Sequence, residues 1–214
     1  MTNPNPSQSL IKTMFSSAGK LTFFVFISII LLLSIRYVTA PEIQQAERQT
    51  LLNTFSEVLP STYYDNDPLK NTKVITDPAY LKLLGSSEPV TFYRATKNNQ
   101  PAGAIFTTIA PNGYSGKIYV LIGVFPDGRI SGVRIIKHTE TPGLGDKVEI
   151  NKSKWVLEFD GRNLRDDNDP RWAVKKDGGD FDQFTGATIT PRAVVGAIKN
   201  ALIVVNDLGE RLYE

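Results

Sequence analysis

The sequence predicts an α+β fold, with a single N-terminal transmembrane helix followed by a domain of antiparallel strands and a C-terminal helix. Residues 21–35 form an uncharged and mostly apolar run. Between residues 90 and 138, β-type segments alternate with short turn sequences, and strands joined by such turns pair antiparallel. Apolar residues then recur every three or four positions from residue 194 to residue 208, as in an amphipathic helix. Strands followed by a separate helix give an α+β arrangement.

The composition limits the cofactors that the chain can hold. Its 214 residues include no cysteine and one histidine, His138, which excludes disulfides, cysteine-ligated iron–sulfur clusters and His/Cys zinc sites. If the protein transfers electrons, its carrier must be organic, and a flavin is the natural candidate. The net charge of +2, from 24 basic and 22 acidic side chains, gives no indication of nucleic-acid binding.

Residues 21–40 are expected to cross the membrane as a helix. They follow a cytoplasmic lead, residues 1–20, of which the first 19 are expected to be disordered. A bilayer core needs about 20 helical residues. The uncharged run is shorter than that, but Lys20 and Arg36 at its ends can reach the interface and extend it.

A cleaved signal peptide is the alternative to a retained anchor. Residues 38–40 are small enough to form a cleavage site, but Pro41 would then be the first mature residue, a position at which proline obstructs the protease. We therefore favour the anchor. Lys12 and Lys20 precede the span, and the excess of basic residues on the cytoplasmic side of membrane helices puts the large domain on the outer side of the membrane.

Residues 41–89 are expected to form a stalk helix and a connecting segment, and residues 90–214 the outer domain. Helical spacing continues to Leu59. Asp77-Pro78 and Gly85 are typical of the start and the end of a short helix. The strands of the outer domain are expected at residues 90–97, 103–109, 117–125 and 130–138.

The last helix is expected to begin with Thr190 as its N-cap and Pro191 as its first residue. The residues just before it would then lie at a helix N-terminus, where unpaired N–H groups and the helix dipole favour a phosphate. Gly186 and Ala187 leave room for a ligand to approach the backbone. From the pattern alone, a polar turn before a capped helix remains the alternative.

The residues before this helix carry a resemblance. Asp182-Gln183-Phe184-Thr185-Gly186-Ala187-Thr188 is similar to the flavinylation motif of FMN-binding subunits in bacterial ion-pumping redox complexes. Residues 138–147 and 172–181 resemble the G subunit of the Rnf electron-transport complex, and the C subunit of the sodium-pumping NADH:quinone reductase is a related family. The likeness covers roughly residues 100–200. It implies an FMN joined through its phosphate to the hydroxyl of Thr188.

The resemblance also implies roles for neighbouring residues. The flavin ring would lie against the loop from Glu140 to Gly145, with polar contacts from Glu140 and Thr141 and an apolar contact from Leu144. Lys175 and Lys176 would compensate negative charge near the flavin. The implied cofactor-binding residues are completed by Gly143, Asp182, Thr185, Gly186 and Ala187.

The function implied is that of an electron-transfer subunit in the bacterial inner membrane, not catalytic alone. Its complex would couple electron flow between ferredoxin and NAD to ion transport, and its partners would be the other subunits. A separate flavin transferase, with FAD as donor, would attach the cofactor. The alternative is a membrane-anchored envelope module that binds an anionic ligand without a covalent bond.

Two further functions are not supported by the sequence. The acidic stretches at residues 166–169 and 177–180 lack the ligand spacing of an EF-hand calcium loop, and the first is expected to be a solvated loop. A hydrolase with a threonine nucleophile needs a histidine base, and His138 has no carboxylate partner at a recognisable spacing.

Overall fold

The computed structural model describes residues 6–214, with side chains from Met14 onward, and divides into two compact units between Leu52 and Asn53. The first unit consists of helix α1, which spans Pro6–Val58 and so continues into the second unit. α1 contains a stretch that is long and apolar enough to cross a membrane, and its side chains from residue 21 to residue 38 are exposed.

Polar side chains within the apolar stretch of α1 satisfy their hydrogen bonds inside the helix. The hydroxyls of Thr22, Ser28 and Ser34 each donate to the carbonyl four residues earlier, at 2.7–2.9 Å. A lipid environment offers no water to a hydroxyl, so this pattern makes all three residues compatible with the expected span.

The start of α1 corrects the expectation of a disordered lead. Helix begins at Pro6, a favourable first helical position for proline, and the lead is helical from there to residue 19. Residues 1–5 of the expected lead lie outside the described residues. α1 continues through Pro41 to Val58, across the residues at which the stalk helix was expected.

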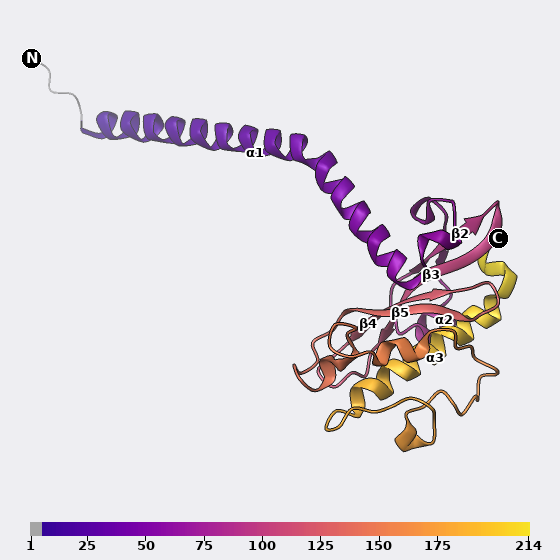
Figure 1. Ribbon diagram of the computed structural model, residues 1–214. Helices are drawn as coiled ribbons and strands as arrows, with labels where there is room; N and C mark the ends of the chain where they lie inside the picture. The colour runs from indigo at the N-terminus through magenta and orange to yellow at the C-terminus, as the bar shows by residue number, and fades with distance from the viewer. Residues whose placement is uncertain (1–5) are drawn as a thin grey trace, which may run out of the picture. The chain divides into compact units, whose positions relative to one another are not determined.

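The second unit is built on one antiparallel sheet of five strands in the order β1-β2-β3-β4-β5, which Figure 1 shows running from magenta to orange. Four of its strands confirm the sequence expectation. The strands are β1 Thr72–Ile75, β2 Val90–Lys97, β3 Gln100–Ala110, β4 Ile118–Val124 and β5 Ile130–Lys137. β1 was not expected, because an edge strand of four residues is too short to show a period.

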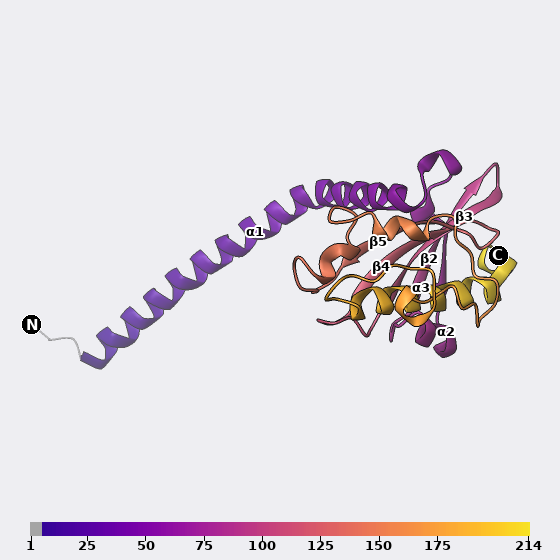
Figure 2. The ribbon, with the colours of Figure 1, turned by 60° about the horizontal axis from the view of Figure 1, so that its bottom comes forward.

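Helix α3, Ile189–Leu208, covers one face of the sheet together with the short helix α2, Pro78–Leu83 (Figures 1 and 2). The two helices and this face enclose the main hydrophobic core. Its largest fully buried side chains include Phe92, Phe106 and Ile122 of the sheet and Ile198 and Leu202 of α3. The expected amphipathic C-terminal helix and the expected α2 are therefore confirmed.

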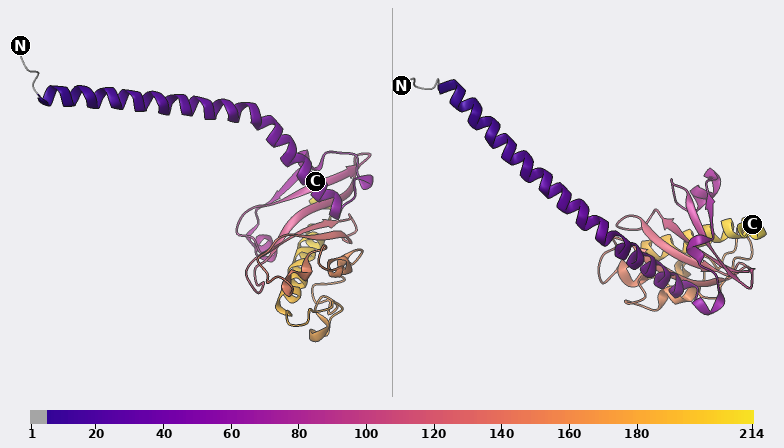
Figure 3. Two further views of the ribbon diagram at one scale, coloured as in Figure 1. Left: turned by 60° about the vertical axis from the view of Figure 1, so that its left-hand side comes forward. Right: turned by 90° about the horizontal axis from the view of Figure 1, so that it is seen from above.

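The opposite face of the sheet is covered by the last turn of α1 (Figures 2 and 3). Gly123 of β4 and Gly132 of β5 are directly opposite each other, and a Cβ on either would lie 2.6–2.8 Å from the carbonyl oxygen of Val58. The same oxygen accepts a hydrogen bond of 2.6 Å from the Ser131 hydroxyl. Two glycines thus let the helix end approach the strands at backbone distance.

The chain between β5 and α3 is irregular but well packed. Its short 3₁₀ turns are Gly145–Val148, Trp155–Phe159 and Lys175–Asp177; others lie at Ser61–Tyr63, Pro68–Lys70 and Gly209–Leu212. Buried aromatic rings hold the connection together, with Phe159 stacked 4.5 Å from Phe181 and edge-on to Trp155 at 5.3 Å. Rings at such distances stabilise beyond their area burial, so a long connection can hold fixed turns.

Candidate functional site

A cavity of about 460 Å³ opens beside the first residues of α3. Three segments far apart in the sequence form its walls: the loop between β3 and β4, the loop after β5, and the segment that leads into α3. The lining residues are Tyr114, Glu140, Thr141, Leu144, Gly145, Gly186, Ala187, Thr188, Ile189 and Thr190.

The loop after β5 enters the cavity as a tight turn. Leu144 N–H donates to the carbonyl of Thr141 at 3.1 Å, and Gly143, the third residue of the turn, has a φ of 80°. A type II turn requires positive φ in the third position, which favours glycine, and proline is common in the second. The sharp turn expected from the Pro142-Gly143 step is therefore present, and it exposes Leu144 to 43%.

The segment before α3 forms a second turn of the same kind. Ala187 N–H donates to the carbonyl of Phe184 at 3.1 Å, and Gly186 in the third position has a φ of 80°. The two turns face each other, since a Cβ on Gly186 would lie 3.7 Å from a methyl group of Leu144. Aromatic packing fixes the second turn, because Phe184 meets the Trp155 ring edge-on at 5.2 Å.

The start of α3 differs from the expectation. The helix begins at Ile189, and Thr188 occupies the N-cap position. Within the described part of the chain, the Thr188 side chain makes no capping hydrogen bond. Thr190 is fully buried in the first turn and donates its hydroxyl to the Glu140 carboxylate. Thr190 therefore does not cap the helix, because it already lies inside the first helical turn, one residue after Ile189.

Glu140 is a buried carboxylate, 4% exposed, and protein groups engage both of its oxygens. Oε1 accepts the backbone N–H of Ser115 at 2.9 Å, and Oε2 accepts the hydroxyl of Thr190. Buried carboxylates are strongly destabilising unless their oxygens are paired. In the wall of the cavity, Glu140 therefore links the loop that contains Ser115 to the first turn of α3.

His138 has a carboxylate partner that the sequence did not indicate. Its Nε2 lies 2.6 Å from Glu149 Oε1, and its Nδ1 accepts the backbone N–H of Glu140 at 3.0 Å. Because Nδ1 accepts, the neutral ring carries its proton on Nε2 and donates it to Glu149. The expectation of no partner was wrong, but both ring nitrogens are occupied, so His138 offers no free base for hydrolysis.

Some of the expected residues lie outside the cavity lining. Lys175 and Asp182 form an exposed ion pair with Nζ and Oδ1 2.6 Å apart, and this pair raises the pKa of Lys175. Lys176 and Thr185 are exposed, and neither they nor Gly143 is among the lining residues. The cavity therefore brings together Glu140, Thr141, Leu144, Gly186, Ala187 and Thr188 of the expected set.

Tyr114, Ile189 and Thr190 line the cavity although the sequence did not assign them to it, and Gly145, the last residue of the expected loop, lines it too. Tyr114 precedes the motif by nearly 70 residues, and its place depends on strand pairing between β3 and β4. Ile189 follows the motif directly, and its 46% exposure breaks the apolar-inward pattern of α3.

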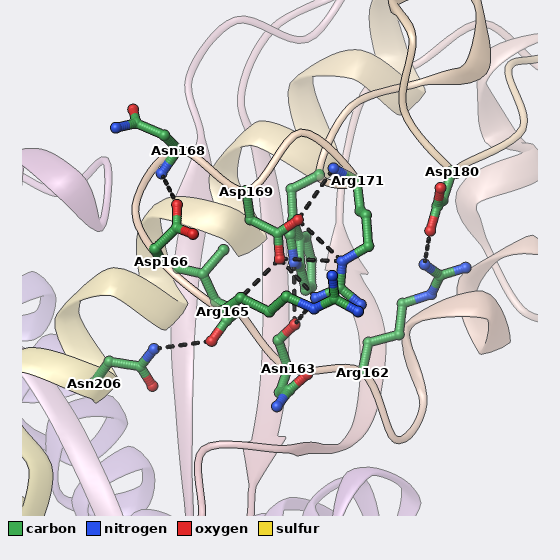
Figure 4. Close-up of polar contacts among 11 residues, drawn as sticks. Arg162, Asn163, Arg165, Asp166, Asn168, Asp169, Arg171, Asp180 and Asn206 are labelled. Carbon is green, nitrogen blue, oxygen red and sulfur yellow. Dashed lines mark hydrogen bonds and ion pairs between the residues drawn. The ribbon is translucent and has the colours of Figure 1, made fainter.

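The two acidic stretches are accounted for by ion pairs. Asp169 is buried, where a solvated loop was expected, and its carboxylate receives Nε and the terminal nitrogen of Arg171 at 2.6–3.2 Å (Figure 4). Asp177 pairs with Arg192 of α3 at 2.6 Å. Among the described residues, no group of three or more His, Cys, Asp or Glu side chains could hold a metal ion.

A second cavity, of about 430 Å³, shares Ile189 with the first and is lined mainly by α2, α3 and the end of β3. Its polar side chains are Lys82, Asn112, Arg192 and Asn200. None of the described residues that line it carries a hydroxyl or a carboxylate. It therefore offers no attachment point for a phosphoester, and the threonine-lined cavity remains the candidate site.

Comparisons with known proteins agree with this site. The FMN-binding domain family matches residues 113–203. The chain is 47% identical to the G subunit of the ion-translocating oxidoreductase complex of Pseudoalteromonas atlantica, over 90% of this chain and 88% of the relative. It is 45% identical to the same subunit of Vibrio cholerae over 82% of each chain, and 44% identical to that of Pseudomonas aeruginosa over 94% and 92%. The chain belongs to the family of G subunits of ion-translocating oxidoreductase complexes.

Proposed function

We propose that this chain is the FMN-carrying electron-transfer subunit of an ion-translocating oxidoreductase complex, with the cofactor joined through a phosphoester to Thr188. It acts with the other subunits of the complex and is not catalytic alone. Residues 21–40 anchor it in the bacterial inner membrane, and residues 90–214 form the FMN-binding domain on the periplasmic side. Residues 41–89, a stalk helix and a connecting segment, join the anchor to that domain.

The residues of the cavity fit FMN. The volume of about 460 Å³ lies within the roughly 300–1,000 Å³ that small-molecule and cofactor sites occupy. Tyr114, Leu144 and Ile189 give exposed apolar and aromatic surface for a planar ring, and Thr141 adds a hydroxyl. Gly186 has no side chain between the backbone and a ligand. When bound, FMN would supply the redox chemistry that these side chains lack.

The observation that carries the proposal is the different situation of three threonine hydroxyls. Thr188 lines the cavity and makes no capping hydrogen bond to the described residues. Thr190 also lines it, but donates its hydroxyl to Glu140. Thr185 is exposed on the turn and does not line the cavity. Among the three, only Thr188 combines a place in the cavity with a side chain that is not engaged in capping the helix or in bonding Glu140.

The attachment itself requires a separate flavin transferase with FAD as donor. The Thr188 oxygen forms the new bond to the phosphorus on the FMN side of FAD, the pyrophosphate bond breaks, AMP leaves, and the hydroxyl proton is lost. The exposed Asp182–Lys175 pair and Thr185 are accessible for the transferase to recognise. A tethered flavin cannot dissociate into the periplasm, so dilution does not limit its occupancy.

Thr188→Ala should abolish flavin fluorescence in the denatured polypeptide, because the attachment oxygen is gone. The measurement is in-gel fluorescence of the full chain, made in cells that contain the transferase. Thr185→Ala and Thr190→Ser keep the Thr188 hydroxyl and should remain fluorescent. A fluorescent Thr188→Ala band would overturn the assignment.

The same gel tests the alternative of a non-covalent envelope binding module. A ligand held only by the fold leaves when the fold is lost, whereas a phosphoester survives denaturation. Wild-type protein that is yellow when folded and colourless after denaturation would support the module and contradict the covalent link.

A further inference from the structure

Glu140 joins three segments of the chain, two of which are also linked by the Thr139 hydroxyl, which donates to the Ser115 carbonyl at 2.8 Å. Its Oε1 accepts the N–H of Ser115, in the loop that carries Tyr114. Its Oε2 accepts the hydroxyl of Thr190, in the first turn of α3. Its own backbone leads directly into the turn from Thr141 to Leu144. Each of these segments contributes residues to the cavity lining.

Two glycines make room for this carboxylate. A Cβ on Gly113 would lie 2.9 Å from Glu140 Oε1, and a Cβ on Gly145 would lie 2.8 Å from Oε2 and 2.8 Å from the Thr190 hydroxyl. Contacts this close force a shift of one partner. The backbone around the carboxylate is therefore shaped to accept it, and Gly145 itself lines the cavity.

The environment of the carboxylate makes these bonds difficult to exchange for others. Glu140 is 4% exposed and Thr190 is 0% exposed, so a broken bond leaves a buried polar atom unpaired, which is costly. A carboxylate beside the first turn of a helix also interacts favourably with the positive end of the helix dipole. The bridge is continued by the Glu140 N–H, which donates to His138.

We propose that Glu140 is a positioning residue: its buried carboxylate holds the Tyr114 loop and the first turn of α3 together in the wall of the cavity, and thereby presents Thr188 for flavin attachment. The proposal deepens the proposed function and rests on it for the attachment step. Glu140 acts through Ser115 and Thr190 rather than as the attachment group, and its bonds to them form the fixed part of the cavity wall.

The direct test is amide hydrogen exchange at Ser115, measured on the full chain in detergent and without attached flavin. Glu140→Ala removes the acceptor of the Ser115 N–H, and exchange there should speed up by about tenfold or more, since hydrogen bonds to charged groups are among the stronger ones. Asp177→Asn is the matched control, because it removes a carboxylate that bonds Arg192, also in the first turn of α3, but outside this cavity. Its Ser115 exchange should equal that of the wild type.

The second measurement is the fraction of chain that carries covalent flavin, by mass spectrometry of protein made with the transferase. Thr190→Val keeps the shape of the side chain but removes its donor, so loading should fall about fivefold or more, and Thr190→Ser should restore it. Glu140→Ala should lose loading likewise, and Asp177→Asn should load fully. Thermal unfolding of each variant shows which are folded, and Glu140→Leu, which also removes both acceptor oxygens, replaces Glu140→Ala if the latter is not.

Two results would overturn the proposal: unchanged Ser115 exchange in a folded Glu140 variant, or full loading of folded Thr190→Val. A wild-type chain without covalent flavin would instead overturn the proposed function. In that case the exchange measurement still decides whether Glu140 fixes the Tyr114 loop.

Discussion

At the scale of single residues, the sequence shows which side chains are chemically suitable but not which are already engaged. Thr188 and Thr190 are the same residue type two positions apart, and only the partner of Thr190, 50 residues earlier in the chain, distinguishes them. The motif itself was readable, as was the turn at Gly143. The pairing of Glu140 with Thr190 depends on tertiary packing, and no local pattern encodes it.

Asp169 gives a pH-dependent prediction. The Arg171 guanidinium beside it holds the pKa of this carboxyl well below its usual range, with further help from the backbone N–H groups of Arg165 and Arg171. A depressed folded-state pKa means that the stabilisation is complete above the unfolded pKa of about 3.9 and is lost as the pH falls below it. Asp169→Asn should lower Tm at pH 7 by about 2–4 °C.

Thermal unfolding between pH 7 and pH 3 checks this prediction. The difference in Tm between wild type and Asp169→Asn should be constant above about pH 5 and shrink as the pH falls below about 4. Asp166→Asn is the control on the same loop, since Asp166 is exposed and its side chain accepts the N–H of Asn168 (Figure 4). A difference that grows on acidification would contradict the assigned ion pair.

Leu144 gives a prediction about the flavin environment. Its side chain is 43% exposed at the cavity, so Leu144→Ala should change the free energy of unfolding by no more than about 0.5 kcal/mol. The flavin absorption spectrum and reduction potential should shift nonetheless, with covalent attachment intact, because the ring would lose an apolar contact. An unchanged spectrum and potential would return this residue to the role of an ordinary turn residue.

At the scale of secondary structure, the regular elements were predictable and the junctions were not. The β2–β3 hairpin follows from Asn98 and Asn99, which both adopt positive φ, as its two-residue turn requires. The edge strand β1 has too few residues to show its period. Thr190-Pro191 is a favourable cap sequence, yet α3 begins before it at Ile189, and Thr190 lies in the first turn, where its hydroxyl donates to Glu140.

Gly132, one of the two glycines under the end of α1, should tolerate an added methyl group less well than a glycine in α3. Gly132→Ala would bring a Cβ within 2.8 Å of Val58 backbone atoms, and overpacking of this kind costs about 1–3 kcal/mol. Gly196→Ala, in the middle of α3, meets nothing within 4 Å and should be neutral or stabilise by up to about 1 kcal/mol. Urea unfolding of the two variants measures the difference, and equal stability would contradict the close approach.

At the scale of the whole molecule, the division into an apolar N-terminal helix and a folded domain was readable from charge and apolar patterning. Whether residues 21–40 are retained or cleaved can be tested directly. We predict that residues 21–40 remain in the mature protein and keep it in the membrane during an alkaline wash, since a span of this length partitions into the bilayer. A mature N-terminus mapped to Pro41 by mass spectrometry would contradict this prediction.

Orientation requires a separate measurement. A reporter that is active only in the periplasm should give a signal when fused to the C-terminus, as the basic residues before the span predict. An inactive fusion, with a signal from a cytoplasmic reporter at the same place, would reverse the orientation and leave the retained anchor unaffected. The matched control is the same reporter fused before the span, which should give the opposite result.

The position of α3 in the chain has a consequence for biogenesis. During synthesis all five strands, residues 72–137, emerge before the helix that covers their inner face. Until residues 189–208 arrive, the side chains of Phe92, Phe106 and Ile122 remain open to water, and uncovered sheets of this kind invite aggregation. A chain that ends before residue 189 would therefore leave these side chains uncovered and should aggregate more readily than the full chain.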